Sequence, residues 1–124
     1  MAKRCRAWPC IRDMSDWYPF DGGQSIGQRG SEGGTILRDE EHLDGSRITL
    51  ERGGHTPFSI TRGIYGWMVH TRFFADEPEA QSAFEEMKPE LVNVLNIIPL
   101  ADELDNTKVE AVSDALTDFT ERFP

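Results

Sequence analysis

Residues 47–74 read RITLERGGHTPFSITRGIYGWMVHTRFF, and apolar residues recur there at every second position. In RITLER, Ile48 and Leu50 alternate with polar residues, and in PFSITR Phe58 and Ile60 do the same. Alternation of this kind is typical of antiparallel strands that have one face on a core and one face toward water. Four strands are expected, at about 35–40, 46–52, 56–62 and 64–74.

The loop between the second and third of these strands decides which of their side chains share a face. Directly opposed residues of a hairpin lie on the same face of the sheet. A three-residue loop at 53–55, GGH, sets Leu50 opposite Phe58 and Ile48 opposite Ile60. We predict this loop, because a two-residue Gly-Gly turn would mix polar and apolar residues on the core face.

The last hairpin is predicted to turn at Arg62 and Gly63, which sets Ile60 opposite Tyr65 and Phe58 opposite Trp67. The core face then carries Ile48, Leu50, Phe58, Ile60, Tyr65, Trp67, Val69 and Phe73. The second face carries Arg47, Thr49, Glu51, Ser59, Thr61, Ile64, Met68, His70, Arg72 and Phe74.

Two loops are considered for the connection between the first and second strands. A two-residue turn at Asp44 and Gly45 would place Asp39 opposite Leu50, with a second carboxylate two positions along on the core face. Burying carboxylates is unfavourable unless they are paired, so a longer loop over residues 41–46 is expected. The exact pairing of this strand stays open.

Two amphipathic helices follow the strands. The first has an apolar stripe from Ala80 to Ile98, a capping-box pattern at residues 76–79, and Pro89, which predicts a kink or break near Lys88. The second is expected to begin at Thr107. Its predicted buried residues are Val109, Val112, Leu116 and Phe119.

These elements predict an α+β protein: a four-stranded antiparallel meander with two or three C-terminal helices packed on one face. An irregular segment precedes it, because residues 1–33 show no periodicity and end in GGQSIGQRGSEGG. Residues 1–33 are therefore expected to be a basic arm and a glycine-rich loop that pack on the domain, and 34–124 a single domain. The glycines are expected to serve turns or close approach of the backbone.

The charge of the chain limits its partners. The formal net charge is −9 and the isoelectric point is about 4.7, which disfavours nucleic acid and anionic membranes as partners. No apolar run is long enough for a membrane helix, and the first ten residues lack the apolar region of a secretory signal. A cytoplasmic location is expected.

The candidate site residues are Tyr65, Met68, His70, Arg72 and Phe74. All five belong to the most aromatic stretch of the chain, and four of them fall on the predicted second face. That face is interpreted in three ways: as a solvated surface, as a subunit interface, or as a ligand surface on which a histidine could act as acid or base.

Metal and nucleophile motifs give no positive support for an enzyme. DEEH at residues 39–42 cannot direct four consecutive side chains to one ion, since neighbours on a strand point to opposite faces. Cys5 and Cys10 have neither zinc-ligand nor redox spacing, and no phosphate-loop or nucleophile-elbow motif occurs. No metal and no cofactor are therefore predicted.

Three functions are compatible with this pattern. The leading hypothesis is a non-catalytic binding or regulatory protein that forms a homodimer through the sheet edge or the second face. The alternative is a small-ligand binder or enzyme that uses His70 and Arg72 at a groove in the sheet. The third is an inhibitor or immunity-type protein whose acidic C-terminal helices bind a basic protein partner.

Overall fold

The computed structural model describes residues 16–97 and 106–123, with side chains from 110 onward in the second range. Its elements are β1 (Trp17–Pro19), the short 3-10 turn η2 (Phe20–Gly23), β2 (Thr35–His42), β3 (Ser46–Arg52), β4 (Phe58–Ile64), β5 (Met68–Phe74), α1 (Glu77–Ile97) and α2 (Asn106–Arg122). The basic arm with Cys5 and Cys10, the residue Ile98 and the side chain of Val109 lie outside the described part of the chain.

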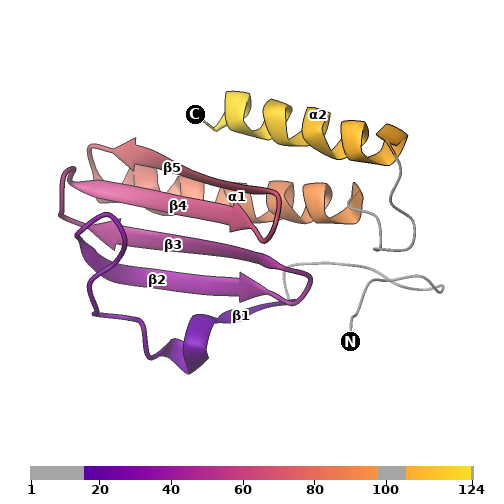
Figure 1. Ribbon diagram of the computed structural model, residues 1–124. Coiled ribbons are helices and arrows are strands. Elements are labelled where there is room, and N and C mark those ends of the chain that lie inside the picture. Colours follow the sequence, from indigo (N-terminus) through magenta and orange to yellow (C-terminus); the bar gives the residue numbers. More distant parts are fainter. Residues whose placement is uncertain (1–15, 98–105, 124) are drawn as a thin grey trace.

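The strands form one antiparallel sheet in the order β1-β2-β3-β4-β5 (Figure 1). The α+β class and the antiparallel sheet are confirmed, but the sheet has five strands rather than four. The added strand, β1, pairs with β2 through Trp17 and His42. A three-residue strand that contains a proline shows no alternation, so the sequence pattern could not predict it.

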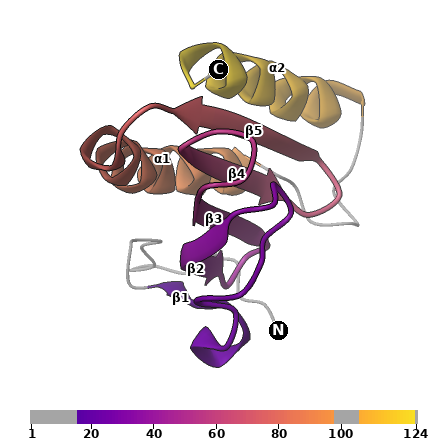
Figure 2. The same ribbon diagram turned by 90° about the vertical axis from the view of Figure 1, so that its left-hand side faces the viewer.

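The two faces of the sheet are covered differently (Figure 2). Helix α1 packs on one face, called here the helix face, which carries Ile48, Leu50 and Ile60. Helix α2 lies beside α1 at the β5 edge of the sheet (Figures 1 and 2). The glycine-rich segment between η2 and β2 lies on the other face, called here the open face, which carries Thr49 and Thr61.

The core lies between the helix face and the two helices. Ile48, Leu50 and Ile60 are completely buried. They cluster with the apolar stripe of α1, formed by Ala80, Ala83, Phe84, Met87, Leu91, Val94 and Leu95, and with Val112 and Phe119 of α2. Each large side chain buried in this way stabilises the fold by about 1.5–3 kcal/mol. The predicted helical stripes are confirmed where they are described.

Helix α1 begins where the capping pattern predicts. The Oδ1 atom of Asp76 accepts a hydrogen bond of 2.9 Å from the backbone N–H of Glu79. Of the predicted kink or break near Lys88, the break is wrong, because α1 continues unbroken through Pro89 to Ile97. Pro89 cannot donate to the carbonyl of Glu85, but both residues are exposed, so water can donate to that carbonyl instead.

The β3–β4 loop spans residues 53–57 rather than 53–55. Leu50 therefore pairs with Ile60 instead of Phe58, and Phe58 pairs with Arg52. Loops of three and five residues have the same parity, so the faces of β3 and of residues 58–61 of β4 are as predicted, although the pairs are shifted by two residues. The predicted position of Ile64 on the second face is wrong, because Ile64 ends β4 on the helix face and is buried in the core.

The last hairpin differs from its predicted register. It turns at Tyr65, Gly66 and Trp67 rather than at Arg62 and Gly63, with Gly66 at a φ of 83°. This loop pairs Ile64 with Met68, so every residue of β5 lies on the face opposite to the predicted one. His70, Arg72 and Phe74 lie on the helix face, and Val69 and Phe73 lie on the open face.

The β2–β3 connection is also shorter than predicted, with Leu43, Asp44 and Gly45 in the loop and Glu40 opposite Ile48. The longer loop over 41–46 is therefore wrong. A bulge between Ile36 and Arg38 accompanies this register. As a result β2 places a carboxylate and a guanidinium, those of Glu40 and Arg38, on the helix face.

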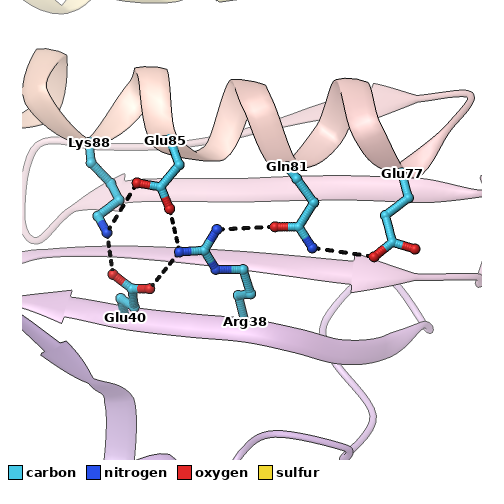
Figure 3. Close-up of polar contacts among 6 residues, drawn as sticks. All are labelled: Arg38, Glu40, Glu77, Gln81, Glu85 and Lys88. Carbon is cyan, nitrogen blue, oxygen red and sulfur yellow. Dashed lines mark hydrogen bonds and ion pairs between the residues drawn. The ribbon is translucent and has the colours of Figure 1, made fainter.

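These charges are satisfied by α1 in a set of contacts called here the junction network (Figure 3). Its members are Arg38, Glu40, Glu77, Gln81, Glu85 and Lys88. The Nζ atom of Lys88 lies 2.6 Å from Glu40, and Arg38 donates to Glu40 and Gln81 at 3.1 Å and also to Glu85. The guanidinium of Arg38 lies 4.0 Å from the centre of the Phe84 ring. A carboxylate is tolerated on this face because cations of two elements surround it.

Candidate functional site

The glycine-rich segment is held on the open face by Glu51, which is 1% exposed. The Glu51 carboxylate accepts the backbone N–H groups of Gly34 at 3.0 Å and of Glu32 at 3.2 Å. A Cβ atom on Gly30 would lie 2.2 Å from the carboxylate carbon of Glu51, and one on Gly34 would lie 2.7 Å from the carbonyl oxygen of Arg52. Glycines at these two positions therefore permit close approach, as the sequence predicts.

A groove of about 750 Å³ lies on the open face, between this segment and the β4–β5 hairpin loop. It is lined by Arg29, Gly30, Ser31, Ile36, Arg47, Thr49, Glu51, Thr61, Gly63, Ile64, Tyr65, Gly66, Trp67, Met68 and Val69. Grooves of roughly 300–1,000 Å³ are typical of small-molecule sites. This groove is the candidate functional site.

The groove combines apolar walls with a few polar groups. Tyr65, Trp67 and Val69 form its apolar side, and Val69 is 78% exposed. Thr49 and Thr61 project hydroxyl groups from the floor, where Thr61 is hydrogen-bonded to Thr71 at 3.0 Å. The cation Arg29 is exposed and has no ion pair among the described residues. This mixture suits a ligand with a flat apolar body and an anionic group.

Asp39, which contacts the groove residues Arg47 and Thr49, is 2% exposed and is saturated by hydrogen bonds. Arg47 donates to both of its oxygens, at 2.9 and 2.7 Å, Thr49 donates at 3.0 Å and Ser25 at 2.8 Å. The hydrogen bond to Asp39 raises the pKa of Arg47. The guanidinium of Arg47 also lies 3.5 Å from the ring centre of Phe20, so this cluster anchors the N-terminal segment to the sheet.

At one end of the groove the hydroxyl of Tyr65 donates to Glu41 at 2.7 Å, and that of Tyr18 donates to the other oxygen of Glu41 at 3.1 Å. Burial and the hydrogen bond to Glu41 raise the pKa of Tyr65. Tyr65 therefore remains a protonated hydrogen-bond donor near neutral pH and does not serve as a base.

The five candidate residues predicted from the sequence do not form one site in the structure. Tyr65 and Met68 line the groove. His70 and Arg72 lie on the helix face with Arg62, so their predicted position on the second face is wrong, and Phe74 is buried in the core on that same face.

The polar residues that β3 and β4 contribute to the open face were predicted correctly, and Arg47, Thr49, Glu51 and Thr61 line the groove. Sequence reasoning missed Arg29, Gly30 and Trp67. For Arg29 and Gly30 the signal was the run of glycines, which indicated a close approach of the backbone but not that it packs against Glu51. Trp67 was missed because its place depends on the position of the hairpin turn.

The DEEH segment is divided between both faces and its acidic groups have other partners. His42 lies on the helix face, where its ring contacts Trp17 edge-on and its Nδ1 atom accepts from the N–H of Asp44 at 3.0 Å. Among the side chains that the structure describes, no three of the types His, Cys, Asp and Glu form a group that could hold a metal ion.

Comparisons of the chain with protein-family models, with curated proteins and with solved structures found no match. Within the described residues, neither helix is both long enough and apolar enough to cross a membrane. The groove and the charges around it therefore provide the evidence for a function.

Proposed function

We propose that the chain is a non-catalytic binding protein whose ligand site is the open-face groove. The observation that supports this most directly is a groove of about 750 Å³ whose acidic and hydroxyl side chains already form hydrogen bonds within the fold, such as those of Glu51 and Thr49. The proposed ligand is a small molecule with a flat apolar body, which would lie against Trp67 and Val69, and an anionic group that Arg29 would bind.

Binding is favoured over catalysis because the groove offers no free acid or base. Glu51 accepts backbone N–H groups, and Asp39, which contacts two lining residues, accepts from three side chains. General acid–base catalysis needs a group that can take up and release a proton near the operating pH. Among the described lining residues there is no histidine or cysteine, and Tyr65 is held protonated.

Arg29→Glu and Val69→Asp are expected to weaken binding of an aromatic anion about tenfold or more, because the first reverses the available cation and the second charges the apolar wall. Anilinonaphthalene sulfonate is a suitable probe, with its fluorescence titrated on the folded protein. Both residues are exposed, so neither variant should unfold the chain.

Arg52→Glu and Leu43→Asp are the matched controls for this titration. They make the same chemical changes at exposed residues that do not line the groove, and they should retain the affinity of the wild type. Equal affinity in all four variants would reject the groove as the ligand site. A wild type without affinity for the probe would reject the ligand chemistry proposed here.

A second candidate function, homodimer formation through the open face, is favoured by exposed apolar residues on β5. Val69 is 78% exposed and Phe73 is 50% exposed, and both lie on this face. Helix α2 lies beside the β5 edge (Figure 1), so a second copy would approach the open face rather than extend the sheet.

Phe73→Asp is expected to convert such a dimer to a monomer, since burying a charge in an apolar contact is unfavourable. Native mass spectrometry over a concentration series would report both the subunit count and any retained ligand. Leu43→Asp should leave the subunit count unchanged. A wild type that stays monomeric at high micromolar concentration would eliminate the dimer without affecting the ligand proposal.

The hypothesis of a basic protein partner remains a prediction. On α2 the acidic residues Glu110, Asp114, Asp118 and Glu121 are exposed, which is the condition that such a surface requires. Asp118 also lies 3.8 Å from Arg122 of the same helix, so part of this charge is neutralised locally.

A further inference from the structure

Arg62 of β4 is completely buried on the helix face, and it donates to no acceptor in the described part of the chain. Its Nε, Nη1 and Nη2 atoms are each inaccessible to solvent, and none of them has a hydrogen-bond partner among the described residues. Its guanidinium lies 5.5 Å from the ring centre of Phe119 of α2. A guanidinium carries five N–H donors, and a buried charge without a partner costs several kcal/mol.

The groups next to Arg62 add positive charge rather than compensate it. His70 lies directly opposite Arg62 on β5, and its buried Nε2 atom has no hydrogen-bond partner within residues 16–97 and 110–123. Arg72, two residues further along on the same face, is half-buried. Burial and the charge of Arg72 lower the pKa of Arg62 to about 10, so Arg62 is still a cation at neutral pH.

No acidic side chain among the described residues neutralises this group. On α1, Glu85 contacts Arg38 and Lys88 of the junction network. Glu90 of α1 pairs with Arg122 of α2 at 2.9 Å. The described carboxylates of α2 are exposed, and this helix presents the Phe119 ring to Arg62.

We propose that Arg62, His70 and Arg72 form a binding site for a small oxyanion of the sulfate or phosphate type, on the face of the sheet opposite to the groove. The planar fork of Arg62 would bind two oxygens at the closed end of the site. His70 and Arg72, which are half-buried, would bind the anion from the solvent side. A small anion is proposed rather than a folded partner, because the guanidinium of Arg62 is completely buried and a protein surface could not contact it.

Sulfate is the first probe, titrated at millimolar concentration against chloride at constant ionic strength. The melting temperature of the wild type is expected to rise by about 5–10 °C when sulfate exceeds its dissociation constant about a hundredfold. Arg62→Met should abolish this rise. It should melt no lower than the wild type in chloride, because an apolar side chain replaces an uncompensated charge.

Arg52→Met is the matched control, since it removes an exposed arginine from the neighbouring strand β3 and should retain the full response to sulfate. Phosphate and acetate, titrated in the same way, identify the anion class: a tetrahedral site should favour phosphate over acetate. If acetate raises the melting temperature more than phosphate does, the site binds a carboxylate, and the proposal of a sulfate- or phosphate-type ligand is overturned.

The pH dependence of sulfate binding gives a second readout that does not require Arg62→Met to fold. Burial and the charge of Arg62 lower the pKa of His70, and a bound dianion would raise it again. Sulfate keeps its charge over this range, so wild-type affinity should increase about tenfold between about pH 7.5 and pH 5.5. His70→Gln should bind sulfate with the same affinity at both pH values.

A melting temperature of the wild type that does not respond to sulfate would overturn the site, and so would an equal response in Arg62→Met. Wild-type affinity that does not change with pH would remove His70 from it. Because the groove lies on the other face, Arg29→Glu should not alter the sulfate response. Failure of this proposal and failure of the proposed function are therefore distinguishable.

Discussion

Phe74→Ala is expected to lower the free energy of unfolding by about 3–4 kcal/mol, whereas Phe73→Ala should lower it by less than about 1 kcal/mol. Phe74 is 5% exposed and belongs to the core on the helix face, so its removal leaves a cavity. Phe73 points from the open face and is half exposed. Urea denaturation monitored by circular dichroism measures both values.

The two phenylalanines form an internally controlled pair, because they are adjacent residues of the same type in one strand. The hairpin turn at Arg62 and Gly63 that the sequence favours would bury Phe73 instead and expose Phe74. A larger loss for Phe73→Ala would therefore show that β5 has the opposite register. Phe74→Leu keeps most of the volume and should lose less than about 1.5 kcal/mol.

Lys88→Ala is expected to lower the free energy of unfolding by about 3 kcal/mol, because it removes one partner of a buried ion pair. The Lys88 side chain is 9% exposed, and its Nζ atom lies 2.6 Å from Glu40. Arg38 would still donate to Glu40, which keeps the loss at the lower end of the range for buried pairs. Thermal and urea denaturation of the two proteins at neutral pH measure the difference.

Two further variants separate the ion pair from general packing. Arg122→Ala breaks an exposed contact with Glu90 and should leave the stability almost unchanged. The double variant Lys88→Met with Glu40→Leu should recover most of the loss, since it replaces both charges with apolar groups. A double variant as unstable as Lys88→Ala would show that the pair itself stabilises the junction between β2 and α1.

Much of the fold could be predicted from local pattern. Alternation in β3 and β4 predicted their strands and faces, and the stripe from Ala80 to Leu95 predicted the contact surface of α1. Asp76 was recognised as a cap because the residue types of a capping box are short-range signals. These features depend on residues that are close in sequence, within the roughly 11–18 residues over which periodicity is read.

The candidate site could be predicted only in part. The polar residues of β3 and β4 were placed on the open face, since parity follows directly from alternation. The candidates from β5 were placed on the wrong face, because two glycines, Gly63 and Gly66, each offered a turn. A shift of the turn from Arg62 and Gly63 to the loop around Gly66 reverses the face of every later residue in the strand.

By itself the sequence determined the α+β class, the order of the four longer strands and the two helices, and the residues of α1 that face the core. The tertiary structure alone decided which face β5 presents, how Glu40 could be placed on the helix face, and which residues meet at Arg62. The physical reason is that these outcomes depend on partners distant in sequence. Lys88 compensates Glu40 across the junction, and His70 and Arg72 meet Arg62 only after the hairpin has closed.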